Sequence, residues 1–197
     1  SRLAEVRTAF TFKDEETIVD VGAHTGLGAI ATVYSHPGRK AICIEAEEKA
    51  FKVLEQNIQQ NGLQNQIQAV RQAISGEERR LYFHKRKNQA NFLNEKPTDP
   101  AEKGFQEISV KSLDQLLLNE LGIKRVTYLN LTINLAEYQA LKGAKTLIRQ
   151  QDAIRICAAG WYKTHSGELA FNKIVPLLKS YGLDVFHTNY GKVIGKI

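Results

Sequence analysis

The sequence predicts an α/β protein built on a Rossmann-like, doubly wound and mostly parallel sheet. Short apolar runs rich in β-branched residues alternate with longer segments of helical periodicity, an order typical of parallel sheets with helices on both faces. A glycine-containing turn at residues 20–26 follows the first of these runs. The chain has 197 residues, of which 43% are apolar, and this suits one packed core. We therefore expect a single domain over residues 1–197, with residues 1–16 as a short lead.

Three strands alternate with two helices in the first half of the chain. Thr17–Val21 is a β-branched run that ends in the glycine-containing turn, and residues 27–34 are small and apolar, as in a closely packed helix. The breakers His36-Pro37-Gly38 and Asn61-Gly62 end the two helical segments. The expected elements are, in order, a strand at 17–21, a helix at 27–34, a strand at 41–44, a helix at 47–61 and a strand at 67–70.

The middle of the chain departs from this alternation. Residues 77–87 combine the β-formers Leu81, Tyr82 and Phe83 with many charges. Residues 88–104 are polar and contain two prolines, so we expect an excursion loop there. A short strand is expected at 107–110.

Regular structure resumes at Ser112, which is suited to cap a helix over residues 113–121. The chain ends with two strand-like runs around the turn Asn189-Tyr190-Gly191, and this predicts an antiparallel hairpin at one sheet edge. The remaining expected elements are a strand at 126–133, a helix at 136–148, a strand at 153–158, a helix at 171–181 and the hairpin strands at 183–188 and 192–197.

Composition excludes several classes of protein. No apolar run approaches the about 20 residues of a membrane-spanning helix. Cys43 and Cys157 each lie in an apolar run, which favours buried, reduced thiols in a cytoplasmic protein over disulfides or a zinc site. The net charge of +6 is compatible with an anionic partner but does not require one. Methionine is absent and the chain opens at Ser1, so we expect a trimmed N-terminal boundary. Nothing in the sequence indicates an oligomeric state.

The strongest signal for a ligand is the turn Asp20–Gly26 together with Glu45. Gly22 permits a sharp strand-to-helix turn, and Gly26 permits close approach to the amides at the helix N-terminus. Glu45 ends the next strand about 20 residues later, where a carboxylate can accept both hydroxyls of a ribose. A dinucleotide would require a glycine in place of His24, so the spacing favours S-adenosylmethionine. Alternatively, the glycines serve only close helix–strand packing.

Residues 18–73 are similar to the first half of a class I methyltransferase. The later segments Lys111–Leu117 (KSLDQLL) and Ala136–Ala144 (AEYQALKGA) resemble the FkbM-type methyltransferase family in particular. The resemblance covers residues 17–181 and implies a seven-strand sheet, S-adenosylmethionine as cofactor, and O-methylation of a small hydroxylated metabolite or sugar. By position, it places the cofactor against Asp20, Gly22, Ala23, His24, Gly26, Glu45, Ala46, Gln72 and Ala73.

The chain departs from the family pattern at the end of the fourth main strand. The family usually carries Lys-x-Asp-x-Glu-Gly before Ala-Glu, whereas this chain has Asn130, Thr132, Asn134 and Leu135. Without those carboxylates no metal is expected. Either the enzyme is active on an acceptor that needs no strong base, because methyl transfer requires mainly alignment, or the protein binds the cofactor with altered or lost chemistry. The candidate catalytic residues are Asn130, Thr132, Asn134, Glu137 and His165.

Other side chains have less specific signals. Trp161 and Tyr162 follow the fifth strand, where the family carries a Tyr-His pair, and are the candidate substrate residues. Trp161 is expected either to stack on a substrate or to cover the core. We expect His36, His84 and His187 in solvated turns or strands, with no metal-ligand spacing.

A basic segment lies at residues 79–87. Basic residues interleaved with aromatic ones can hold a phosphate backbone and stack on bases, so an RNA-modifying or nucleic-acid-binding variant is an alternative. Glu77 and Glu78 dilute the positive charge and favour a solvated edge strand. A small-molecule or glycan-precursor substrate is therefore favoured over nucleic acid. The five basic residues are Arg79, Arg80, Lys85, Arg86 and Lys87.

Overall fold

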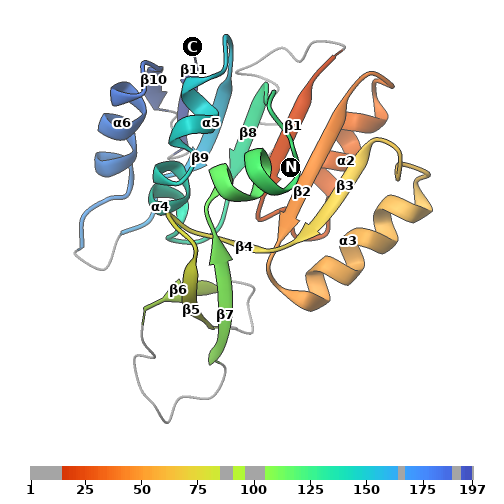
Figure 1. The fold of residues 1–197 in the computed structure, drawn as a ribbon, viewed down its shortest axis with the longest axis horizontal. Helices are drawn as coiled ribbons and strands as arrows, with labels where there is room; N and C mark the ends of the chain where they lie inside the picture. Colours follow the sequence, from red (N-terminus) through yellow and green to blue (C-terminus); the bar gives the residue numbers. More distant parts are fainter. Residues whose placement is uncertain (1–14, 85–90, 96–104, 164–166, 188–191, 197) are drawn as a thin grey trace.

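The structure, a computed structural model, describes residues 15–84, 91–95, 105–163, 167–187 and 192–196. Its main feature is a seven-stranded sheet with the strand order β10-β11-β9-β8-β1-β2-β3 (Figure 1). Five strands are parallel, and β11 runs antiparallel to both of its neighbours. The predicted doubly wound, mostly parallel sheet is confirmed. The strands are β1 (Thr17–Val21), β2 (Lys40–Glu45), β3 (Ile67–Arg71), β8 (Tyr128–Leu131), β9 (Arg155–Ala159), β10 (Asp184–His187) and β11 (Lys192–Lys196).

Helices cover both faces of this sheet. Because side chains alternate along a strand, β1 directs Ile18 to one face and Val19 and Val21 to the other, where they join two separate core clusters. The helices α2 (Leu27–Tyr34) and α3 (Glu48–Gln60) contribute to the cluster with Ile18. The opposite face carries the π-helix η1 (Asp114–Glu120), α4 (Glu137–Lys142), α5 (Lys145–Arg149) and α6 (Phe171–Ser180).

The single helix expected at residues 136–148 is instead two helices, α4 and α5. At the junction, a Cβ on Gly143 would lie 2.8 Å from the backbone oxygens of Ser75 and Gly76. The junction between α4 and α5 can therefore pack closely against residues 75 and 76 only because residue 143 is glycine. The Asp114 carboxylate accepts hydrogen bonds from the backbone N–H groups of Thr146 and Leu147, at 2.9 and 2.8 Å. This carboxylate therefore caps the start of α5.

A second sheet lies beyond the carboxyl ends of the parallel strands (Figure 1). β6 falls inside the range expected to be an excursion loop, so part of that range is strand. His84 is not solvated as expected: it is buried, with its ring 4.2 Å from that of Phe105 and 4.9 Å from that of Phe92. The strands, in the order β4-β7-β5-β6, are β4 (Ala73–Ile74), β7 (Phe105–Lys111), β5 (Arg79–His84) and β6 (Phe92–Asn94).

Cys43 and Cys157 are buried in the core cluster that contains Ile18, as the apolar runs around them predicted. Within the described part of the chain, every helix is too short or too polar to span a bilayer.

Candidate functional site

The turn between β1 and α2 binds the end of β2 through its backbone. The N–H groups of Gly22 and Ala23 both donate to the carbonyl oxygen of Ile44, at 2.9 and 3.1 Å. Gly22 and Gly26 have φ angles of 80° and 77°, in the left-handed region that favours glycine. Gly26 occupies the N-cap position of α2 without a capping side chain, so amides of the first helical turn are available to a ligand.

Both glycines also allow close packing of the protein against itself. A Cβ on Gly22 would lie 2.1 Å from the carbonyl oxygen of Thr132. A Cβ on Gly26 would lie 2.4 Å from a methyl group of Leu54 on α3. The packing interpretation therefore accounts for the requirement for glycine at both positions. A direct contact of either glycine with the cofactor remains a prediction.

Glu45 lies beside this turn at the carboxyl end of β2. One of its carboxylate oxygens accepts the backbone N–H of His24, and the other accepts that of Glu47, each at 2.8 Å. A carboxylate has about four acceptor positions, so two remain for further donors. The turn thus holds Glu45 in place and leaves it able to accept a pair of hydroxyl groups.

Asp20 and Asn130 lie side by side in β1 and β8, where the strand order reverses. Both side chains are buried, and the Asn130 amide donates to the Asp20 carboxylate at 2.7 Å. Cys43 is the neighbour of Asp20 on β2, and burial together with the Asp20 charge raises the pKa of its thiol. Asn130 therefore holds Asp20 in place, and this amide donor is already engaged within the protein.

Glu137 joins the loops that follow β8 and β9. It is fully buried; it accepts the backbone N–H of Ile133 at 2.9 Å and the hydroxyl of Tyr162. Burial raises the pKa of the Glu137 carboxyl, and burial and the Glu137 charge raise the pKa of Tyr162. Glu137 therefore links Ile133, in the loop after β8, to Tyr162, in the loop after β9, and a catalytic role for it stays a prediction.

The other residues after β8 are held mainly through the backbone. Thr132 donates its N–H to Val21 at 2.9 Å, and its carbonyl is the group that faces Gly22. Asn134 donates its side-chain amide to the carbonyl oxygen of Asn91 at 3.0 Å, which joins this loop to the segment that begins β6. Asn134 and Leu135 have positive φ angles of 49° and 82°.

The residues expected beside the adenine lie where the two sheets meet. Ala46 packs on the apolar cluster that contains Ala73. The Gln72 amide donates to the carbonyl oxygens of Ser109 and Ala73, at 2.9 and 3.2 Å, which leaves its oxygen as an acceptor. Two further members of the cluster, Leu81 and Val110, were not among the predicted site residues. The sequence feature that could have identified them is the apolar character of the two short runs that contain Leu81 and Val110.

The remaining candidates fall outside this group or outside the described residues. The Trp161 side chain is 64% exposed, so it does not cover the core, and a contact with substrate remains a prediction. In the basic segment, Arg79 and Arg80 pair with Glu95 and Glu107, each at 3.1 Å. His165, Lys85, Arg86, Lys87, most of residues 88–104, the turn at 189–191 and residues 1–14 lie outside the described residues.

The geometry at the carboxyl edge of the sheet fits S-adenosylmethionine. An uncapped helix N-terminus, a carboxylate with free acceptor positions and an apolar surface beside a carboxamide oxygen lie around the turn after β1. These groups match the carboxylate, ribose and adenine parts of that molecule. No cluster of three or more metal-ligating side chains occurs among the described residues.

The match to a protein family assigns the chain to the class of S-adenosylmethionine-dependent methyltransferases. The family described as "Methyltransferase FkbM domain" matches residues 20–185. The chain therefore belongs to the FkbM methyltransferase family, whose cofactor is S-adenosylmethionine. No curated protein matches the sequence.

Solved structures share the fold at low sequence identity. A methyltransferase FkbM from Methylobacillus flagellatus KT has a TM-score of 0.66 and 16% identity; the match covers 96% of this chain and 45% of that one. TrmK of M. capricolum, solved with S-adenosyl-homocysteine, has a TM-score of 0.56 and 13% identity; the match covers 100% of this chain and 66% of that one. A SAM-dependent methyltransferase from Aquifex aeolicus has a TM-score of 0.54 and 11% identity; the match covers 98% of this chain and 87% of that one. The chain thus spans under half of the Methylobacillus protein.

Proposed function

We propose that this chain transfers the methyl group of S-adenosylmethionine to an oxygen of a small hydroxylated metabolite or sugar. The observation that carries the proposal is the position of Glu45. Its carboxylate is held by the His24 N–H at the turn after β1 and keeps two acceptor positions. FkbM family membership supports methyl transfer from this cofactor.

In the proposed complex, each part of the cofactor faces groups of this chain. Glu45 would accept the ribose hydroxyls, and the amides that follow Gly26 would bind the methionine carboxylate. Ala46, Ala73 and the Gln72 oxygen would border the adenine. Bound there, the cofactor supplies an electrophilic methyl group on a sulfonium.

The residues after β8 support alignment of an acceptor more than deprotonation. Asn130 donates to Asp20, Asn134 donates to Asn91, and Glu137 is buried with both of its oxygens engaged. Thr132 is neutral. Direct displacement at an activated methyl group depends mainly on distance and line of approach, so an acceptor oxygen that needs no strong base suits this site.

A second candidate function is cofactor binding with altered or lost chemistry. It is favoured because the amides of Asn130 and Asn134 are not bases and each already donates within the protein, while the Glu137 carboxylate is fully buried and accepts from Ile133 and Tyr162. Nucleic-acid modification has less support, since Arg79 and Arg80 are paired with glutamates and their charge is partly neutralised.

Calorimetric titration with S-adenosylhomocysteine tests the cofactor site. Glu45→Gln is expected to weaken binding about tenfold or more, because hydrogen bonds to a charged acceptor are lost. Glu55→Gln, on the exposed surface of α3, is the matched control and should bind like the unmodified protein. Equal affinity of all three proteins would contradict the assignment of Glu45.

A transfer assay separates the two candidate functions. The protein is incubated with S-adenosylmethionine labelled in its methyl group and with fractionated polar metabolites and sugars. Label in a hydroxylated small molecule supports O-methylation. Cofactor binding without transfer to any fraction supports altered chemistry, and label in RNA supports nucleic-acid modification.

A further inference from the structure

We propose that a cavity at the amino-terminal edge of the large sheet binds a small phosphorylated metabolite. The cavity has a volume of about 560 Å³, in the range of small-molecule sites. Its lining includes the first residues of β1, β2 and β3, namely Thr17, Lys40 and Ile67. The groups proposed for the cofactor follow the opposite, carboxyl ends of these strands. This is therefore a separate site, and it goes beyond methyl transfer.

The charge of the cavity is positive. Lys40, Lys124 and Arg125 line it, and no Asp or Glu is among its lining residues. The three side chains are exposed, and none forms an ion pair with a carboxylate of the described residues. Three unneutralised cations around one concave surface attract a polyvalent anion such as a phosphate ester.

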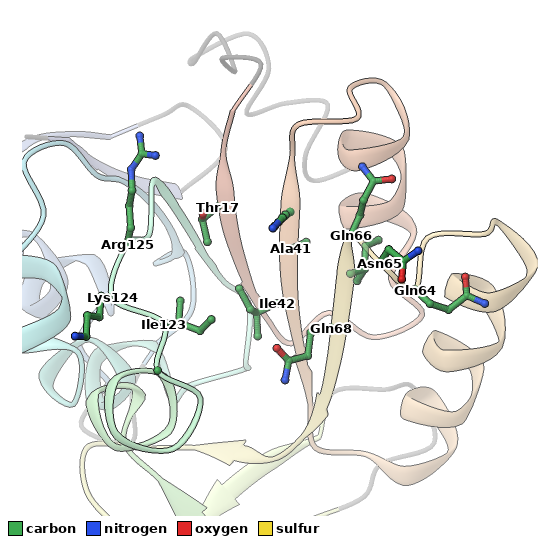
Figure 2. Close-up of a pocket in the computed structure, with 13 residues that line it drawn as sticks. Thr17, Ala41, Ile42, Gln64, Asn65, Gln66, Gln68, Ile123, Lys124 and Arg125 are labelled. Atoms are coloured by element: carbon green, nitrogen blue, oxygen red, sulfur yellow. The ribbon is translucent and has the colours of Figure 1, made fainter.

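Carboxamide residues line the side of the cavity opposite Lys124 and Arg125. Figure 2 shows Lys124 and Arg125 on one side and the Gln64–Gln68 segment on the other, with Ala41 and Ile42 between them. Carboxamides both donate and accept hydrogen bonds, which suits the hydroxyls of a sugar or the edge of a base. The lining residues include no aromatic side chain, so the stacking on which single-stranded nucleic acids depend is missing.

Side-chain amides of two glutamines hold the backbone on both sides of the cavity by hydrogen bonds. Gln151 is buried; it donates to the carbonyl oxygen of Lys124 and accepts the N–H of Val126, each at 3.0 Å. Across the cavity, Gln66 donates to the carbonyl oxygens of Pro37 and Arg39, at 3.2 and 3.3 Å. The backbone on each side is therefore fixed before a ligand arrives, which lowers the entropic cost of binding.

Titration of the full chain with defined probes tests this site. The probes are inorganic phosphate, adenosine monophosphate and glucose 6-phosphate, with adenosine and glucose as unphosphorylated counterparts, each followed by calorimetry and by amide chemical shifts. Phosphorylated probes should bind, their counterparts should not, and saturating S-adenosylhomocysteine should leave binding unchanged. The tighter of the two esters identifies the class of metabolite.

Paired charge reversals locate the binding. Lys124→Glu with Arg125→Glu should weaken binding of the esters at least tenfold, whereas Lys142→Glu with Lys145→Glu changes the net charge equally at exposed positions outside the cavity lining and should have little effect. Gln68→Leu should weaken the esters but not inorganic phosphate. The proposal is overturned if no phosphorylated probe binds, if S-adenosylhomocysteine displaces it, or if both double variants lose affinity equally.

Discussion

Leu135 occupies a backbone conformation that favours glycine. Its φ angle is 82°, and the FkbM-type pattern has glycine at this position. A left-handed conformation costs a residue with a Cβ about 1–2 kcal/mol. Leu135→Gly is therefore expected to be more stable than Leu135→Ala by about 1 kcal/mol, since both remove the leucine side chain but only glycine removes the strain. Chemical denaturation measures this difference, and an alanine variant of equal or higher stability would contradict the strain.

Glu137 is expected to make stability depend on pH. Burial raises the pKa of its carboxyl above the ordinary value of 4.5, so the folded state holds this proton more tightly than the unfolded state. The contribution of Glu137 to the free energy of unfolding is therefore fully present below about pH 4.5 and falls as pH rises toward the folded pKa.

Glu137→Gln should remove that dependence. Relative to the unmodified protein, the variant should gain stability as the pH rises above about 4.5, as measured by urea denaturation at several pH values. Glu55→Gln, exposed on α3, is the control and should follow the unmodified protein. Parallel curves for Glu137→Gln and the unmodified protein would rule out this role.

The break between α4 and α5 depends on a contact between elements. Asp114 of η1 caps the first amides of α5, and loss of a cap typically costs about 1 kcal/mol. Asp114→Ala should therefore lower the free energy of unfolding by about that amount. Asp152→Ala, at an exposed position, should change it by less than about 0.5 kcal/mol. Similar values for the two variants would show that the cap contributes nothing.

Strand pairing in the small sheet decides which side chains of β5 are buried. Pairing of β5 with β7 and β6 places Leu81 opposite Ile108, in one apolar cluster with Val110, and buries His84 between Phe92 and Phe105. These partners come from segments that the sequence does not connect by any local pattern. The charges around residues 79–87 favour a solvated strand, and only the pairing shows which of its side chains are buried.

Cofactor binding should stabilise the whole molecule. A ligand at 100 times its dissociation constant adds about 2.7 kcal/mol to the free energy of unfolding, which corresponds to a rise of about 5–10 °C in Tm for a chain of this size. S-adenosylhomocysteine should produce this rise, and Glu45→Gln should reduce it at the same concentration. A dinucleotide such as NADH is the control, because His24 stands where a dinucleotide site needs glycine; a larger rise with NADH would contradict the cofactor assignment.

Much of the large sheet was predictable from local patterns. The β-branched runs at 17–21 and 41–44 lie in β1 and β2, and residues 27–34 form α2, because burial on both faces of a parallel sheet selects continuous apolar runs. The location of the candidate cofactor residues at one edge of the sheet was predictable too, because the carboxyl ends of parallel strands meet there. What each side chain bonds to there was not predictable.

The sequence by itself determined the class of fold, the turn at Asp20–Gly26 and the acidic residue that ends β2, since each depends on residues close together in the chain. The tertiary structure decided the partners: Asn130 with Asp20, Tyr162 with Glu137, and Thr132 against Gly22. It also placed three cations around a cavity at the far edge of the sheet. These contacts join strands and loops many residues apart, and their geometry follows from packing and strand register, which no local pattern encodes.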